Sequence, residues 1–192
     1  MFVTDSSTRL AGIQSGEYDV AHAMPYDSVE IIKNDPNIKN FVYPGGYLSV
    51  YFNKKKGLFT DVKARHAVNL AINKTDVLTA AYSYDEYFVS NSNIMMNHQK
   101  QWTSDLWKEY HNEYDPEEAK QLLEEIGYTG EEIKLIVTRD YEDQYNASVV
   151  VQETLMQVGL NAKLEVYDWP TLLDKLEDPT AYDRNVMGYG PS

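Results

Sequence analysis

The chain contains no cysteine among its 192 residues. Disulfides, thiolate nucleophiles and cysteine-based metal sites are therefore excluded, and the composition suits either a reducing or an oxidising compartment. Basic residues are also scarce, with 17 Lys and Arg against 30 Asp and Glu, which gives a formal net charge of −13. Nucleic acids and anionic membrane surfaces both require clustered Lys and Arg, so we expect neither as a partner.

Long apolar runs and targeting signals are missing as well. No apolar run approaches the ~20 residues that span a bilayer, and the first residues, MFVTDSSTRL, lack the basic and apolar regions of a signal peptide. Hydrophobic residues nevertheless make up 43% of the chain, which excludes disorder and allows one sizeable core or two small ones. Either the protein is cytoplasmic, or the chain is a piece of a longer protein.

Helix and strand signals alternate along the chain, and no glycine- or proline-rich linker divides it. Regular alternation of this kind predicts an α/β domain with a largely parallel or mixed sheet. Residues 83–114 look irregular and polar, with one short helix near 105–110. Elsewhere we expect helices at 7–16, 27–32, 61–72, 75–81, 115–127, 145–158 and from 168, and strands at 18–24, 47–53, 133–137, 162–166 and 185–190.

The ends of the predicted helices carry capping residues. Asp115 is expected to cap the helix of YDPEEAKQLLEEIGY, with Pro116 at its first position and Gly127 at its end. A Ser or Thr is expected to cap the helix at 7–16, and Asp27 the one that follows. Asp61 is expected to cap a helix whose inward stripe has the spacing of a packed face, at Ala64, Ala67, Val68, Ala71 and Ile72.

No catalytic motif is present in the sequence. G-x-S-x-G, Walker A, G-x-G-x-x-G and H-E-x-x-H are all missing. The histidines have no metal-ligand spacing; they are His22, His66, His98 and His111. We therefore expect neither an enzyme nor a metal site nor a cofactor, which leaves binding as the function.

Binding residues are expected where strands end, because ligands of open α/β sheets lie beyond the carboxyl ends of the strands. Three segments qualify by position: 22–24, 138–141 and 188–190. Arg139 follows the buried run LIVT and could hold a ligand carboxylate by paired hydrogen bonds. It could equally pair with a neighbouring acid, and the residues alone favour that pairing because exposed ion pairs are common. The candidate acids are Asp140, Glu142 and Asp143.

Four blocks of the sequence carry a resemblance to a known family. RLAGIQSGEYDV, YFNKKKGLFTDVKARHAVNLAINK, YDPEEAKQLLEEIGY and VQETLMQVGLNAKLEVYDW follow one another in the order typical of that family. The chain resembles the family-five extracellular solute-binding proteins, the peptide and nickel class that serves ABC importers. The third block resembles the family's signature almost residue for residue. The second block has its signature residues in place: Asn53, Phe59, Asp61, Arg65, Ala67, Ala71 and Ile72.

The resemblance implies a fold like that of the type II periplasmic binding proteins, in which two lobes close over a ligand. In the family these motifs belong to the second lobe, which is inserted between two stretches of the first. We therefore expect residues 1–192 to form one lobe, the ligand-binding half, with a mixed sheet flanked by helices and with the first lobe absent from the chain. A signal or lipoprotein sequence would lie upstream, so the implied location is extracytoplasmic, in the periplasm or at the cell surface.

The resemblance also implies site residues. In dipeptide-binding members an arginine at the place of Arg139 anchors the peptide carboxylate, which makes its neighbours Asp140 and Tyr141 candidates too. The same members hold the peptide ammonium with an acid shortly after a Gly-Trp pair. Gly188 and Tyr189 match that pair, but Ser192 stands where the acid is expected, which puts ammonium recognition in doubt. Oligopeptide-binding members use polar residues where this chain has His22 and Ala23, whereas Arg65 belongs to a structural helix signature.

We therefore predict a monomeric, non-enzymatic lobe that binds oligopeptides or dipeptides and works with the membrane permease of an ABC importer through the intact receptor. Two alternatives stay open. The same fold could bind a nickel chelate, heme or sugar, which the identity of a co-purified ligand would decide. The chain could also be the ligand-sensing lobe of a bacterial transcription regulator, which an upstream helix-turn-helix would favour.

Overall fold

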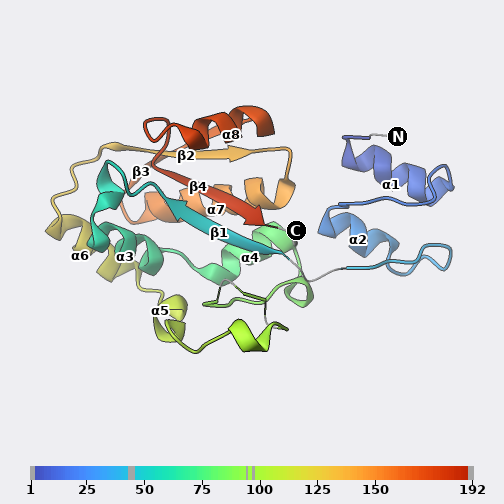
Figure 1. Ribbon diagram of the computed structural model, residues 1–192, viewed down its shortest axis with the longest axis horizontal. Helices are drawn as coiled ribbons and strands as arrows, with labels where there is room; N and C mark the ends of the chain where they lie inside the picture. The colour runs from blue at the N-terminus through green and yellow to red at the C-terminus, as the bar shows by residue number, and fades with distance from the viewer. Residues whose placement is uncertain (1–2, 43–45, 94, 97, 190–192) are drawn as a thin grey trace. The chain divides into compact units, whose positions relative to one another are not determined.

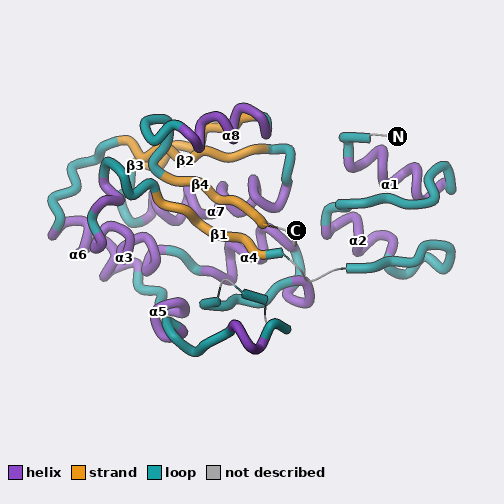
Figure 2. The backbone as a smooth tube through the Cα atoms, viewed as in Figure 1, coloured by secondary structure: helices purple, strands orange, loops and turns teal. Residues whose placement is uncertain are grey.

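The computed structural model describes residues 3–42, 46–93, 95–96 and 98–189. The chain divides into two compact units. Unit 1 consists of Met1–Pro44 with Tyr82–Val89, and unit 2 consists of Gly45–Ala81 with Ser90–Ser192. Every strand of the described residues belongs to unit 2, as Figure 2 shows. The assignment of residues 1–192 to a single lobe stays a prediction.

Unit 1 is built from two short helices, α1 (Ser6–Ser15) and α2 (Tyr26–Ile32). Asp5 caps α1 by accepting a hydrogen bond from the Thr8 amide, so the prediction of a Ser or Thr cap is wrong. Pro25 occupies the cap position of α2, which places Asp27 in the first turn and not at the predicted cap. Val29 and Ile32 of α2 are buried.

The strand predicted at residues 18–24 does not form. Strands need a neighbouring strand to satisfy their backbone N–H and C=O groups, and the described part of unit 1 offers none. The segment bonds to α1 instead: the Tyr18 amide donates to the Gly12 carbonyl at 3.1 Å, and Arg9 Nη2 donates to the Ala23 carbonyl at 3.1 Å. Ala23 has a left-handed backbone with φ 54°, which ends any extended run there.

Unit 2 is built on a four-stranded sheet with the order β1-β4-β2-β3. β1 runs antiparallel to β4, whereas β4, β2 and β3 are parallel. All four strands lie where the sequence predicts them, because short runs of β-branched and aromatic residues are bounded by polar turns. Their bounds are Tyr47–Phe52 for β1, Glu132–Thr138 for β2, Asn161–Tyr167 for β3 and Arg184–Tyr189 for β4.

The two crossover connections place helices on both faces of this sheet. α7 (Glu142–Gln157) joins β2 to β3, and α8 (Trp169–Glu177) joins β3 to β4 across β2. Crossovers between parallel strands are right-handed, so two crossovers that run in opposite directions put their helices on opposite faces. Figure 1 shows α7 and α8 on opposite sides of the sheet. The connections that leave the neighbouring strands β2 and β3 therefore lead to opposite faces of the sheet, and the carboxyl ends of these two strands form a topological switch point.

The remaining long helices of unit 2 complete the α7 layer. α3 (Val62–Ala71) packs against both α6 (Pro116–Glu125) and α7. Asp61 and Asp115 cap α3 and α6 as predicted, each accepting a hydrogen bond from a backbone amide of the first turn. The predicted stripe of α3 is confirmed, because all its members are buried: Ala64, Ala67, Val68, Ala71 and Ile72.

An irregular excursion connects α4 (Lys74–Tyr82) to α6, as predicted from its polar sequence. It contains the short 3-10 turns η2 (Asp85–Tyr87) and η3 (Lys100–Trp102) and the helix α5 (Lys108–Asn112). A third turn, η1 (Leu58–Thr60), precedes α3. Within the described residues, no helix combines the length and the apolar character needed to cross a membrane.

Candidate functional site

The candidate site lies at the carboxyl ends of the parallel strands of unit 2. The loop after β2 carries Arg139, Asp140 and Tyr141, and the loop after β3 leads directly into α8 at Trp169. The end of β4 brings Gly188 to the same edge, because β4 runs parallel to β2 beside it. The structure therefore brings together two of the three segments that the sequence predicts, those after β2 and at the end of β4.

Arg139 is exposed, and the acids beside it do not neutralise it. Its Nη2 donates a hydrogen bond to the Tyr145 hydroxyl at 2.8 Å, and its guanidinium carbon lies 4.6 Å from the centre of the Tyr145 ring. No carboxylate of the described residues lies within ion-pair distance of it. The local ion pair that the residues alone favoured is therefore wrong. Tyr145, one turn into α7, fixes the guanidinium and leaves further N–H groups of Arg139 exposed.

Asp140 and Tyr141 join the loop after β2 to the start of α8. One carboxylate oxygen of Asp140, Oδ2, accepts a hydrogen bond from the Trp169 amide at 2.7 Å. A carboxylate is favourable there because the N-terminus of a helix carries partial positive charge. The rings of Tyr141 and Trp169 meet edge to face with centroids 5.0 Å apart. Asp140 thus links the loop after β2 to the loop after β3. Tyr141 presents an exposed aromatic surface at the switch point.

Gly188 lies against the first turn of α7. A Cβ at this position would come within 3.3 Å of Gln144 Nε2 and 3.8 Å of Asp143 Oδ2, so the strand approaches the helix closely because it has no side chain here. Gln144 is buried, and its Oε1 accepts no hydrogen bond from the described residues. Burial raises the pKa of Asp143 above its ordinary value. The end of β4 therefore packs against the first turn of α7, where the polar side chains of Asp143 and Gln144 are partly or fully shielded from water.

The other predicted site residues belong to unit 1 or have side chains outside the described residues. Tyr189 ends β4 opposite Tyr47, and its side chain lies outside the described residues, as does Ser192. His22 and Ala23 belong to unit 1, where both are exposed and the Ala23 carbonyl accepts from Arg9. Arg65, expected to be structural, donates to the Phe59 and Thr60 carbonyls at 2.8 and 3.1 Å, in the turn before α3.

Two residues at this edge were missed by sequence reasoning. Trp169 follows the strand AKLEV, so the rule that selected Arg139 would have selected it as well. Tyr145 gave no such signal, because its contact with Arg139 depends on where the first turn of α7 places the phenol. Among the described residues, no three His, Asp or Glu side chains are grouped so that they could hold a metal ion.

Comparison with protein families gives a match along the whole chain. The model described as bacterial extracellular solute-binding proteins, family 5 Middle, matches residues 1–192. A probable peptide ABC transporter periplasmic-binding protein of Sinorhizobium fredii is 33% identical over 175 residues, which cover 90% of this chain and 33% of that protein. The dipeptide-binding protein of Escherichia coli is 33% identical over 185 residues, which cover 91% of this chain and 33% of that protein. The chain thus spans about a third of the length of these curated relatives.

Solved structures share the architecture of the chain. A periplasmic binding protein of Helicobacter pylori in complex with a peptide matches with a TM-score of 0.86 and 24% identity, covering 98% of this chain and 36% of that one. The oligopeptide-binding protein AppA of Bacillus subtilis in complex with a nonapeptide matches with a TM-score of 0.81 and 21% identity, covering 99% of this chain and 40% of that one. The predicted fold, a mixed sheet flanked by helices as in type II periplasmic binding proteins, is confirmed.

Proposed function

The chain belongs to the bacterial extracellular solute-binding proteins of family 5, and we propose that it is the ligand-binding half of a receptor that delivers peptides to an ABC importer. Unit 2 supplies one wall of a cleft, and a first lobe outside this chain closes over the ligand by a hinge motion. The role is binding and not catalysis. The receptor works outside the cytoplasm and meets the membrane permease as an intact, monomeric protein.

The proposal rests on Arg139 above all. The exposed guanidinium of Arg139 forms no ion pair with a carboxylate of the described residues, and it lies at a topological switch point, where α/β proteins bind their ligands. Its remaining N–H groups match the two oxygens of a peptide C-terminus, and such charge-assisted bonds are roughly twice as strong as neutral ones. Tyr141 and Gly188 supply an aromatic surface and backbone groups for the rest of an extended ligand, and Asp140 keeps the loop in place.

Calorimetry on an Arg139→Gln variant of the intact receptor tests this role. We expect the variant to bind tri-alanine about 10- to 100-fold more weakly than the wild type, since a hydrogen bond to a charged group contributes about 1.5–3 kcal/mol. The affinity for tri-alanine amide should not change. Lys134→Gln, which removes an equal charge from β2, is the matched control and should leave both affinities intact. If Arg139→Gln weakened the affinity for tri-alanine and for tri-alanine amide equally, Arg139 would have a structural role and would not bind the carboxylate.

A second experiment tests the half-site itself. One lobe provides only part of the contacts and no enclosure, so the 192-residue chain should bind the same peptides far more weakly than the intact receptor does. Binding by the chain alone at ~1 µM or tighter would contradict a shared cleft. Mass spectrometry of a ligand that co-purifies with the intact receptor separates a peptide from a nickel chelate, heme or sugar.

A further inference from the structure

A polar pocket of about 380 Å³ lies in the excursion between α4 and α6, within unit 2. Its volume falls in the range of small-molecule sites, ~300–1,000 Å³, but its lining is unusual because hydroxyl and amide groups replace the apolar side chains of most such sites. The residues that give this character are Ser90, Asn91, Ser92, Asn93, Thr103 and His111.

Three segments line the pocket: residues 90–93, residues 103–105, and α5 with Lys108 and His111. Hydrogen bonds join these segments. Ser90 Oγ lies 2.8 Å from His111 Nε2, which links the first segment to α5. Asn93 Oδ1 accepts from the Ser104 amide at 2.8 Å, which links the first segment to the second. Asn93 Nδ2 in turn donates to Asn91 Oδ1 at 2.9 Å. The walls are therefore joined to each other across the excursion.

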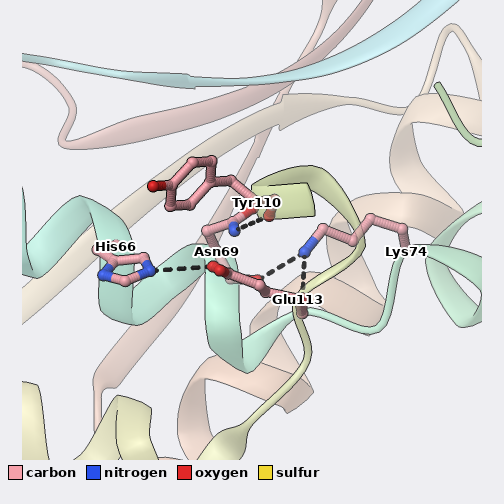
Figure 3. A network of polar contacts seen from close by, with 5 residues as sticks. All are labelled: His66, Asn69, Lys74, Tyr110 and Glu113. Atoms are coloured by element: carbon pink, nitrogen blue, oxygen red, sulfur yellow. Dashed lines mark hydrogen bonds and ion pairs between the residues drawn. The ribbon is translucent and has the colours of Figure 1, made fainter. Parts of the chain in front are cut away.

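The α5 side of the pocket is fastened to α3 and α4, as Figure 3 shows. Asn69 Nδ2 donates to the Tyr110 carbonyl at 2.7 Å, and Lys74 Nζ donates to the Glu113 carbonyl at 2.8 Å. The Glu113 carboxylate lies 3.1 Å from His66 Nε2. Because Tyr110 and Glu113 flank His111 in the chain, these contacts tie α5 to α3 and α4 on both sides of His111. A preorganised wall lowers the entropy that a ligand loses on binding.

The charges at the pocket largely cancel. Lys108 Nζ lies 3.7 Å from Asp105 Oδ1, so the one cation and the one anion of the lining are paired. Burial, together with the positive charge of Lys74, lowers the pKa of His111, which favours the neutral form of its imidazole. A neutral lining rich in groups that both donate and accept hydrogen bonds suits a neutral ligand with many hydroxyl groups, and it disfavours phosphate or a carboxylate.

Two tryptophans adjoin the lining residues in the chain. Trp102 precedes Thr103 and Trp107 precedes Lys108, and their side chains are 65% and 70% exposed. Trp107 also has a left-handed backbone with φ 66°, a conformation that is strained for a bulky residue. Its ring lies 5.5 Å from that of Tyr110. Exposed indoles offer a flat apolar face beside a polar edge, which is the surface that the ring of a sugar requires.

We propose that this pocket binds a neutral saccharide of one or two sugar units. The sugar hydroxyls bond to the Ser, Asn and Thr groups and to His111, while the face of the sugar ring lies on Trp107. The site is separate from Arg139 and does not depend on the function proposed for that edge.

The test is nuclear magnetic resonance on the 192-residue chain, with the indole N–H signals of Trp102 and Trp107 as reporters. Maltose, cellobiose and N,N′-diacetylchitobiose are titrated to above ~1 mM, the weak end of specific affinities. At least one should give a saturable shift of the Trp107 signal. Inorganic phosphate and tri-alanine serve as rival probes and should give none. Failure of all three sugars, or saturation by a rival probe at equal or lower concentration, overturns the proposal.

Variants then locate the binding. Ser92→Phe fills the pocket and should abolish the shift. Trp107→Ala, followed through the Trp102 signal, should weaken the affinity for the sugar by roughly tenfold or more, the effect of about one lost contact. Ser92→Ala removes only one hydroxyl group of the lining, and it replaces Ser92→Phe if that variant fails to fold. It should weaken sugar binding. Arg139→Gln is the control and should bind the sugar like the wild type. Loss of sugar binding in Arg139→Gln would place the sugar at the other edge and refute the assignment.

Discussion

Arg184 is an arginine in the core of unit 2. Its side chain is fully buried in β4, and none of its guanidinium nitrogens has a hydrogen-bond partner among the described residues. Its guanidinium carbon lies 4.9 Å from the centre of the Phe52 ring, which is a favourable cation–π contact. A buried charge without a hydrogen-bonded partner costs folding free energy. We therefore predict that replacing Arg184 with an apolar residue of similar volume stabilises the protein.

The size of the effect follows from the pKa. Burial lowers the pKa of Arg184 to about 9. Because each pH unit of lowering corresponds to about 1.4 kcal/mol, the charged side chain costs the folded state about 5 kcal/mol at pH 7. The desolvated contact with Phe52 offsets about 2 kcal/mol of this cost. Arg184→Met should therefore raise the free energy of unfolding by about 3 kcal/mol, since methionine nearly conserves the volume and needs no partner.

Urea unfolding followed by tryptophan fluorescence measures the change. Arg65→Met is the matched control, because that guanidinium donates to the Phe59 and Thr60 carbonyls at 2.8 and 3.1 Å. The control should lose about 1.5–3 kcal/mol, the ordinary contribution of a hydrogen bond to a charged group. A loss of more than about 1 kcal/mol in Arg184→Met would refute the reasoning, since it would mean that the guanidinium stabilises the core.

The same variant has a pH signature. The folded-state pKa of Arg184 lies below that of the unfolded chain, so above about pH 9 the unfolded state binds more protons and stability rises with pH. At about pH 10 the wild type should have regained about 1.4 kcal/mol, and the advantage of Arg184→Met should shrink by that amount. Lys74, whose pKa burial lowers to about 8, titrates in both proteins and cancels in the difference.

Two further substitutions give opposite signs. Gly12→Ala should destabilise unit 1 by about 1–3 kcal/mol, although alanine is the better helix former by up to about 1 kcal/mol, because its Cβ would collide with the Tyr18 ring. Thermal unfolding checks this, and a gain in stability would show that Tyr18 moves aside freely. Asp143→Asn should stabilise the folded protein at neutral pH, because burial raises the pKa of Asp143. The free energy that the folded state loses by burying the ionised carboxylate grows as pH rises from the ordinary pKa to the raised one. The gain should vanish well below pH 3.8, and a gain that persists there would have another cause.

Much of the fold was determined by the sequence alone, wherever the determining contacts are local. Asp61 and Asp115 each bond to an amide two or three residues further on, so a short stretch of sequence contains the whole cap. The stripe of α3 and the apolar runs of β1 to β4 likewise carry their own periodicity. The position of Arg139 at a strand end followed from the same patterns.

Tertiary structure decided what depends on residues far apart in the chain. Residues 18–24 have the composition of a strand, but a strand forms only beside a partner, and the described part of unit 1 has none. The partner of Arg139 is Tyr145 and not a neighbouring acid, because α7 turns that phenol toward the guanidinium. Asp140 reaches Trp169, 29 residues away, only because β2 and β3 are parallel neighbours. The sequence specifies the chemistry of each side chain. Which group it contacts depends on how the elements pack, because packing determines which groups lie within reach.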